Sequence, residues 1–333
     1  MLKKILFAAV GATVLGVSAS AATAAEYTFK FAHVLSTDTP GHMAAELLAK
    51  KVAENTGGKV AIEVFPAGQL GNDTEIVEQI QLGSIHMGIP PTAKLGNFEQ
   101  RMQLFDLPFI FPTAKAAYAV LDGEIGNELL ATLSAKGLYG AAYWESGFKQ
   151  ITTSVKPIAA PEDLAGIKMR TMSSPLIIQQ YKAWGANPIP IAFAEVYNAL
   201  QQGVAEAQEN SFVSIDKMKF YEVQKYLTVS NHAYLGYAFI VNKAAWDGLP
   251  ADLQSKVQAA IEEARNFQRA ENARLNDSLL EKMKGAGLQI TELDTAGITA
   301  FVEASKKVHD SYADVLGKGM LTRTYAVTNQ HLN

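Results

Sequence analysis

The stretch YTFKFAHVLSTDTPGHMAAELLAKKVAENTGGKVAIEVF, residues 27–65, decides the fold class. Its first six residues alternate between two kinds of side chain, which predicts a β-strand over residues 27–32. Thr39-Pro40 then opens a helical pattern that reaches about Asn55, where two glycines follow. A second strand over residues 60–65 is closed by a proline. The stretch therefore predicts a strand–helix–strand unit.

The same order continues along the chain. A helix is predicted over residues 74–82 and a third strand over residues 85–89. Strands that alternate with helices in this way are typical of a parallel sheet with covering helices. The first part of the chain is therefore predicted to be an α/β unit of β-α-β-α-β order.

The second half of the chain repeats this order. Three strands alternate with two helices, predicted over residues 167–170, 176–184, 188–191, 194–202 and 204–208. EIVEQIQLG, residues 75–83, and EVYNALQQG, residues 195–203, share Glu, Gln and Gly at an offset of 120 residues. The match is short, but together with the repeated strand order it predicts two α/β lobes of similar construction.

A long helical pattern over residues 250–284 ends at Gly285-Ala286-Gly287. At about 1.5 Å per residue, a helix of this length would span both lobes. We expect the chain to cross between the lobes more than once. The predicted lobe I comprises residues 26–147 and 236–275, and the predicted lobe II comprises residues 148–235 and 276–333.

The first 25 residues are typical of a secretory signal peptide. Lys3 and Lys4 precede an apolar run from Ile5 to Val17, and small residues then form a cleavage-like ending. The apolar run is too short to span a bilayer, although an uncleaved anchor is the alternative. The chain has no cysteine, so an exported protein must fold without disulfides. We expect a periplasmic protein that is not itself membrane-embedded.

Composition narrows the classes of function. The 333 residues are 48% hydrophobic and 19% charged, as in soluble globular proteins. A net charge of −4 and the lack of a basic run argue against nucleic-acid binding. Common nucleophile, phosphate-loop and zinc-protease motifs are absent, and the six histidines show no close metal-ligand spacing. The sequence favours binding over catalysis, with no metal and no other cofactor.

Several polar residues are predicted to lie where such folds bind ligands. In open α/β sheets, ligands bind beyond the carboxyl ends of parallel strands. Arg170 ends one predicted strand, Asn210 follows another, and the offset of 120 places residues 90–94 in the matching position of the first lobe. Lys149 lies near the predicted crossing between the lobes. Together with Ser173 and Ser174, these residues predict an anion site.

Arg170 is the predicted anchor of this site, because a planar guanidinium fits a carboxylate with two hydrogen bonds. Each candidate also has a plainer interpretation. A strand-end arginine is often solvated or paired with a nearby glutamate, Lys94 and Lys149 could be ordinary surface lysines, and Asn210 could be a turn residue. Phe193 could equally be a core aromatic. Spacing alone leaves both interpretations open.

Seven stretches carry a resemblance to a known family: KFAHV (30–34), QLG (69–71), FDLPFIF (105–111), DLAGIKMR (163–170), AFAEVY (192–197), AQEN (207–210) and FYEVQK (220–225). They resemble the solute-binding proteins of the tripartite ATP-independent periplasmic (TRAP) transporters, the DctP-like family. The resemblance covers essentially the whole mature chain. It implies two α/β lobes, a long helix across both, and closure around a small organic acid. It also implies a non-enzymatic monomer that serves TRAP membrane permease subunits.

The resemblance also implies roles for individual residues. In that family, the arginine matching Arg170 forms the main salt bridge to the ligand carboxylate, and the residues matching Asn210 and Phe193 line the site. Lys94 and Ser173 fall at positions that bind ligand in related members. His33 and Tyr237, which lie within stretches that carry the resemblance, complete the candidate ligand contacts.

The ligand is harder to predict. WESGFK (144–149) and TVSNHAYLGY (228–237) resemble the C4-dicarboxylate branch, whereas many acid-sugar binders carry Arg where this chain has Lys149. Arg170 would hold one carboxylate and either Lys149 or Lys94 the other, because a buried unpaired carboxylate is costly. We therefore predict a periplasmic receptor for succinate, fumarate or malate. A receptor for a sugar acid or another monocarboxylate, and a secreted α/β enzyme acting on an anionic metabolite, are the alternatives.

Overall fold

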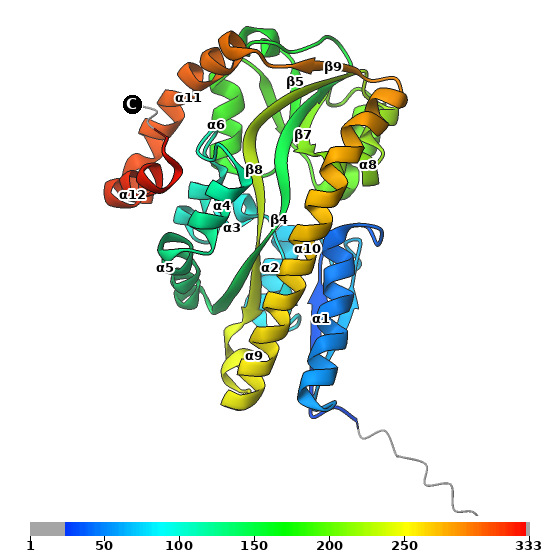
Figure 1. Ribbon diagram of the computed structural model, residues 1–333, viewed down its shortest axis with the longest axis vertical. Helices are drawn as coiled ribbons and strands as arrows, with labels where there is room; N and C mark the ends of the chain where they lie inside the picture. The colour runs from blue at the N-terminus through cyan, green and yellow to red at the C-terminus, as the bar shows by residue number, and fades with distance from the viewer. Residues whose placement is uncertain (1–23, 331–333) are drawn as a thin grey trace, which may run out of the picture.

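The computed structural model describes residues 24–330, so nearly all of the predicted signal peptide lies outside the described residues. In the described chain, nine strands form one sheet in the order β2-β1-β3-β8-β4-β7-β5-β6, and β9 pairs with β8 (Figure 1). The strands are β1 (Tyr27–Ala32), β2 (Val60–Phe65), β3 (Met87–Gly88), β4 (Leu138–Thr153), β5 (Lys168–Thr171), β6 (Asn187–Pro190), β7 (Ala207–Ser211), β8 (Tyr226–Asn242) and β9 (Gln289–Glu292).

Helices cover this sheet and extend beyond it (Figure 1). They are α1 (Pro40–Thr56), α2 (Asp73–Leu82), α3 (Thr92–Leu95), α4 (Ala114–Leu121), α5 (Glu124–Thr132), α6 (Pro175–Ala183), α7 (Val196–Gln201), α8 (Phe212–Lys217), α9 (Lys243–Asp247), α10 (Ala251–Gly285), α11 (Thr295–Leu316) and α12 (Lys318–Thr328). No helix among the described residues has the length and apolarity needed to cross a bilayer. The predicted α/β class is confirmed.

The first unit consists of β1, β2, β3, α1 and α2, close to the predicted bounds. β1 lies between β2 and β3 and is parallel to both. Helix α2 begins with a capping box, in which Asn72 accepts from the Glu75 amide and the Glu75 side chain accepts from the Asn72 amide. Gly83 ends the helix with φ +79°, a conformation that side chains with a Cβ rarely adopt. Local sequence signals therefore set the helix that opens toward the site.

The second unit consists of β5, β6, β7, α6 and α7 and repeats this arrangement. β5 lies between β6 and β7 and is parallel to both. β7 begins at Ala207, three residues later than predicted. Ala205 still donates back to the Ala199 carbonyl and closes the turn after α7, and hydrogen bonding to β5 starts with the Glu206 amide, which donates to Lys168. Asn210 consequently lies within the strand, and the prediction that it follows the strand is wrong.

Two long antiparallel strands, β4 and β8, join the units into one sheet. β8 pairs with β3 of the first unit, and β4 pairs with β7 of the second. The β4–β8 ladder shifts register at three points, one of them between Glu145 and Gly147. Such bulges bend a strand and increase its twist. The crossing between the units is therefore a continuous two-stranded ribbon rather than a loop.

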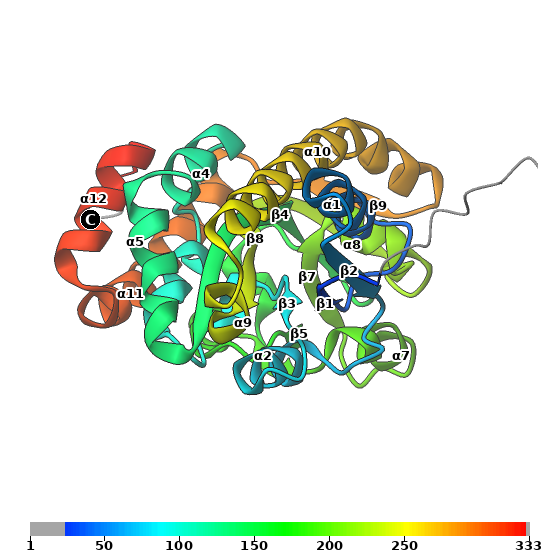
Figure 2. The same ribbon diagram turned by 90° about the horizontal axis from the view of Figure 1, so that it is seen from below.

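Helix α10 runs across both units, as predicted. It packs on α1 at one end and on α8 at the other, and β4 lies beneath it (Figures 1 and 2). The buried amides of Gln268 and Asn272 donate to the carbonyl oxygen of Glu145, at the bulge of β4. Further along the chain, α11 packs on α6 and α12 packs on α4. The two hydrogen bonds to Glu145 therefore hold α10 on the ribbon formed by β4 and β8.

Candidate functional site

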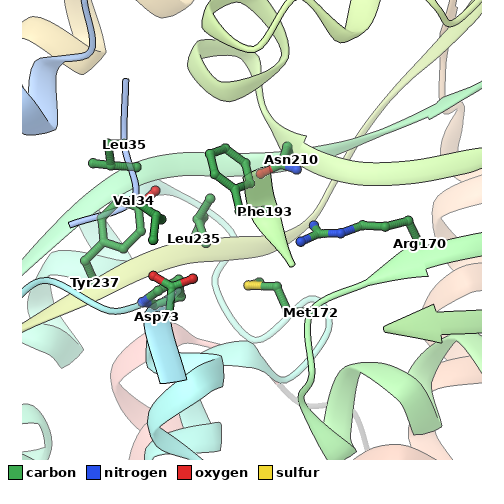
Figure 3. Close-up of a pocket in the computed structure, with 10 residues that line it drawn as sticks. Val34, Leu35, Asp73, Arg170, Met172, Phe193, Asn210, Leu235 and Tyr237 are labelled. Atoms are coloured by element: carbon green, nitrogen blue, oxygen red, sulfur yellow. The ribbon is translucent and has the colours of Figure 1, made fainter. Parts of the chain in front are cut away.

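A narrow pocket lies between the two units. Its walls come from the chain just beyond β1 and β5, from the start of α2, and from β7 and β8 (Figure 3). Ten residues line it: Val34, Leu35, Asp73, Pro91, Arg170, Met172, Phe193, Asn210, Leu235 and Tyr237. The pocket therefore lies at the carboxyl ends of the parallel strands, the position that the strand order predicts.

Arg170 supplies the cation of this pocket. Its side chain is 2% exposed, and its guanidinium points toward the pocket interior (Figure 3). Nε and Nη2 donate to the carbonyl oxygen of Ile191 at 3.1 and 2.8 Å, which fixes the plane of the group. Within residues 24–330, no carboxylate lies within ion-pair distance of it. Burial lowers the pKa of Arg170 to about 10, although the nearby charges of Glu209 and Asp73 oppose this shift. A cation held in this state favours an anionic ligand.

Lys149 lies outside the pocket lining and already has carboxylate partners. Its Nζ donates to Glu209 at 3.0 Å and lies 3.9 Å from Asp106, and all three side chains are buried. Glu209 also accepts from Tyr181 at 3.1 Å and from His232 at 2.7 Å. Burial alone would raise the pKa of Glu209, but Lys149 and His232 hold it at about 2. Lys149 therefore neutralises a carboxylate that would otherwise compete for Arg170.

Lys94 and Ser173 lie beside the pocket, where they line a neighbouring hollow with Asn72 and Ile191. Lys94 Nζ donates to Ser173 Oγ at 3.0 Å, a contact that joins the two units. In the described chain, Lys94 forms no ion pair. Burial lowers its pKa, Asp73 opposes the shift and Arg170 adds to it, so the three charges lie close enough to influence one another.

Of the remaining predicted ligand contacts, three line the pocket and one does not. Asn210, Phe193 and Tyr237 line the pocket, and the Asn210 amide donates to Gln208 at 2.7 Å. His33 does not line it. The His33 ring accepts from the Leu35 amide and contacts His42 at 3.3 Å, and burial lowers its pKa to about 3, so it is neutral at pH 7. His33 is adjacent to the pocket rather than part of its wall.

Five lining residues were not predicted: Val34, Leu35, Asp73, Met172 and Leu235. Pro91 lies in the loop 90–94, which the offset of 120 residues placed at the site. The same offset maps Phe193 onto Asp73. Val34 lies two residues beyond Ala32 of β1, and Met172 lies two residues beyond Arg170 of β5. Ala32 and Arg170 are equivalent, because their partners Gly88 and Gln208 are 120 residues apart. Internal repetition therefore contained a signal for Asp73 that no motif gave.

Comparisons with a family model, with curated proteins and with solved structures all indicate the same family. The model of the bacterial extracellular solute-binding protein family 7 (DctP) matches residues 31–314. The C4-dicarboxylate-binding periplasmic protein DctP of Rhodobacter capsulatus is 40% identical over 329 residues, which cover 98% of each chain.

Two solved structures are also similar. A TRAP periplasmic solute-binding protein from Sulfurospirillum deleyianum with bound succinate has a TM-score of 0.87 and 40% identity, covering 91% of this chain and 99% of that one. The sugar acid binding protein DctPAm from Advenella mimigardefordensis, in complex with galactonate, has a TM-score of 0.88 and 33% identity, covering 91% and 97%. The chain therefore belongs to the DctP family of TRAP transporter solute-binding proteins, whose members are receptors rather than enzymes.

Proposed function

We propose that this receptor binds a C4-dicarboxylate such as succinate, fumarate or malate and delivers it to the membrane permease subunits of a TRAP transporter. The observation that carries the proposal is Arg170, a buried guanidinium that faces the pocket without a carboxylate partner. Leaving a charge buried and unpaired is costly, so the group favours a ligand that supplies the missing anion. One ligand carboxylate would bind there.

The second carboxylate would bind to Lys94. Sequence analysis left Lys94 and Lys149 as equal candidates, but Lys149 is held by Glu209 and Asp106. Lys94 has only the neutral Ser173 hydroxyl as a hydrogen-bond partner in the described chain. Its side chain lines the hollow beside the pocket. The two cations come from different units, so a dicarboxylate would join them.

The pocket is lined by residues of both units, which supports a two-lobed organisation. We propose that lobe I (residues 26–147 and 236–275) and lobe II (148–235 and 276–333) close around the ligand. Contacts across the cleft support this proposal, because Asn97 donates to the Ser173 carbonyl at 2.8 Å and Lys217 lies 3.4 Å from Asp38. Helix α12, which the boundaries assign to lobe II, packs on α4 of lobe I, so it would bridge the two.

The cellular setting follows from the family and the N-terminus. We propose that residues 1–25 are a cleaved signal peptide and that the mature receptor acts as a monomer in the periplasm. The relatives support this location, since the Rhodobacter capsulatus protein is described as periplasmic. The succinate bound to the Sulfurospirillum deleyianum protein supports the dicarboxylate. The galactonate bound to the Advenella mimigardefordensis protein supports a sugar acid as the second candidate.

A binding screen of purified mature protein tests the proposal. Thermal shift followed by calorimetry would compare succinate, fumarate and malate with galactonate, gluconate and butyrate. A true ligand at a hundred times its Kd stabilises the folded state by about 2.7 kcal/mol. We expect the C4-dicarboxylates to give the largest shifts. Larger shifts with the sugar acids would replace the proposed ligand class, and no shift with any acid would contradict the organic-acid receptor.

A further inference from the structure

Asp73 is a carboxylate in the wall of an anion site. It is the first residue of α2 and is 6% exposed, and its side chain points into the pocket opposite Arg170 (Figure 3). In the described part of the chain, no other residue donates a hydrogen bond to this carboxylate or forms an ion pair with it. Its own backbone amide is the hydrogen-bond partner that the carboxylate has. A carboxylate can accept several hydrogen bonds, so this one can accept a further bond from a ligand in the pocket.

The charges around Asp73 favour a ligand that supplies such a donor. Burial raises the pKa of Asp73, and the nearby cations Lys94 and Arg170 oppose the shift. A ligand dianion that engages both cations offsets the charge that stabilises an ionised Asp73. The two ligand carboxylates would also repel this carboxylate, because like charges in a buried site repel strongly. A ligand carrying a hydrogen-bond donor on its carbon chain removes this difficulty.

We propose that Asp73 is a specificity residue that accepts a hydrogen bond from a ligand hydroxyl, so that the receptor selects a hydroxy acid over the corresponding unsubstituted acid. This inference rests on the proposed function, and among the C4-dicarboxylates it favours malate over succinate and fumarate. An ionised carboxylate only accepts hydrogen bonds, so it distinguishes a hydroxyl from a hydrogen or a keto oxygen. Neither Asn210 nor Tyr237 makes this distinction, because an amide and a phenol can each donate as well as accept.

A hydroxyl fits this position better than an ammonium does. Asp73 is buried in the pocket wall. An ammonium would have to lose more of its hydration than a hydroxyl to reach this carboxylate, and removing a charge from water is costly. A hydroxyl costs less to desolvate and donates its hydrogen to the carboxylate. Malate and aspartate, which differ only at carbon 2, separate the two possibilities.

Calorimetry with succinate, the two enantiomers of malate, and L-aspartate tests the inference on the mature protein. We expect the better malate enantiomer to bind at least about tenfold more tightly than succinate, the effect of one hydrogen bond to a charged group. L-aspartate should bind more weakly than malate. In Asp73→Asn the ratio of malate to succinate affinity should fall to within about threefold of one, because removing the negative charge weakens the hydroxyl contact and relieves the repulsion of succinate.

Two further variants serve as controls. Glu54→Gln removes a charge from an exposed position of α1, away from the pocket, and it should keep the wild-type ratio. Asp73→Ser replaces the carboxylate with a group that can also donate, and it should lose the preference as Asp73→Asn does. Agreement between the two Asp73 variants separates loss of the carboxylate from damage specific to one substitution.

Equal binding of malate and succinate to the wild-type protein would overturn the inference, as would an unchanged ratio in Asp73→Asn or tighter binding of L-aspartate. Failure of the proposed function looks different. If none of the C4 dianions binds, the dicarboxylate assignment fails, and 2-hydroxybutyrate against butyrate then tests Asp73 without it. A preference for 2-hydroxybutyrate that disappears in Asp73→Asn would support the inference, and no preference or no binding of either acid would overturn it.

Discussion

The two units have the same topology but contribute different chemistry to the pocket. In each, a central strand lies between two parallel neighbours, β1 between β2 and β3, and β5 between β6 and β7. The strand pairings allow the units to be aligned. Ala32 pairs with Gly88 in the first unit, and Arg170 pairs with Gln208 in the second. Since Gly88 and Gln208 are 120 residues apart, Ala32 and Arg170 occupy equivalent positions.

The first unit therefore has a buried alanine where the second has the anchoring guanidinium. The difference extends to the neighbouring loops, since Asp73 lies where the offset places Phe193. One copy supplies an acid and apolar walls, and the other supplies a cation, an aromatic ring and an amide. The repeated fold brings similar strand ends and loops to the pocket from each unit. Different residues at a few equivalent positions give these two walls opposite charges.

The largest expected effect comes from Lys149, which keeps Glu209 of the second unit neutralised. Lys149→Met would leave Glu209 buried without its principal cation, and breaking such a pair costs about 3–5 kcal/mol. We expect the free energy of unfolding in urea to fall by that amount and ligand binding to weaken, because Glu209 would turn toward Arg170. Lys256→Met, at an exposed site of α10, should change little. A stability within about 1 kcal/mol of wild type would show that Glu209 does not need this partner.

Arg170→Ala makes the second unit resemble the first at the equivalent position. The partner of a desolvated ligand carboxylate is lost, so calorimetry should show affinity reduced by at least about two decades. Folding should be preserved, since the guanidinium forms no ion pair within residues 24–330. Arg170→Lys should also weaken binding, because an ammonium lacks the planar fork. Arg274→Ala on the exposed face of α10 is the control. An affinity within threefold of wild type would remove Arg170 from the anchor role.

Lys94→Met tests the cation that the first unit supplies. Succinate binding should weaken by about tenfold, because its second carboxylate would lose a partly buried charged partner. Butyrate has no second carboxylate, and its weak binding should hardly change. Ser173→Ala removes the contact between the units but keeps the charge, so it should leave the ratio of the two affinities unaltered. If Lys94→Met also leaves that ratio unaltered, the second carboxylate does not bind to Lys94.

The smallest expected effect lies between the units, at Glu145. Burial raises the pKa of this carboxyl to about 7, although Tyr118 and Arg269 oppose the shift. The folded state holds the Glu145 proton more tightly than the unfolded chain does, where the pKa of this carboxyl is near 4.5. Protonation of Glu145 therefore contributes fully to the free energy of unfolding below pH 4.5, and this contribution is lost as the pH rises through 7. Glu145→Gln cannot ionise, so its Tm should fall less than that of wild type between pH 5.5 and 8, by about 2–4 °C.

Asp106 contributes in the same direction, because burial raises its pKa to about 7 as well. Glu145→Gln should therefore flatten the pH profile only in part, and adding Asp106→Asn should flatten it further. Thermal melts at several pH values without ligand provide the measurement. Identical profiles for wild type and Glu145→Gln would show that the carboxyl is not protonated in the folded protein at neutral pH.

Local signals in the sequence were sufficient for the two repeated units. Alternating apolar positions, N-cap residues and stop glycines predicted the strands over residues 27–32 and 60–65 and the long helix over residues 250–284 within one or two residues. Strand order then placed Arg170 at the carboxyl edge of the sheet. These features depend on backbone periodicity and on residues close in sequence, so a single sequence contains them.

The long strands β4 and β8 were not predicted, and the reason is physical. They are buried on both faces over most of their length, so polar residues such as Glu145, Lys149 and Gln150 occur in them without a period of two. Their partners lie far along the chain, and the bulges interrupt the register. No local pattern distinguishes such a segment from a loop.

The sequence alone therefore determined the family, the α/β units and the position of Arg170 at the edge of the sheet, because these follow from short-range pattern and from recognisable motifs. Only the tertiary structure decided which charges face the pocket. Lys149 and Lys94 look alike in the sequence, but one is held by Glu209, 60 residues away, and the other reaches Ser173 across the cleft. Asp73 has no ligand motif of its own and enters the pocket because its helix begins there. The electrostatics of a buried site depend on distances between segments, which folding alone establishes.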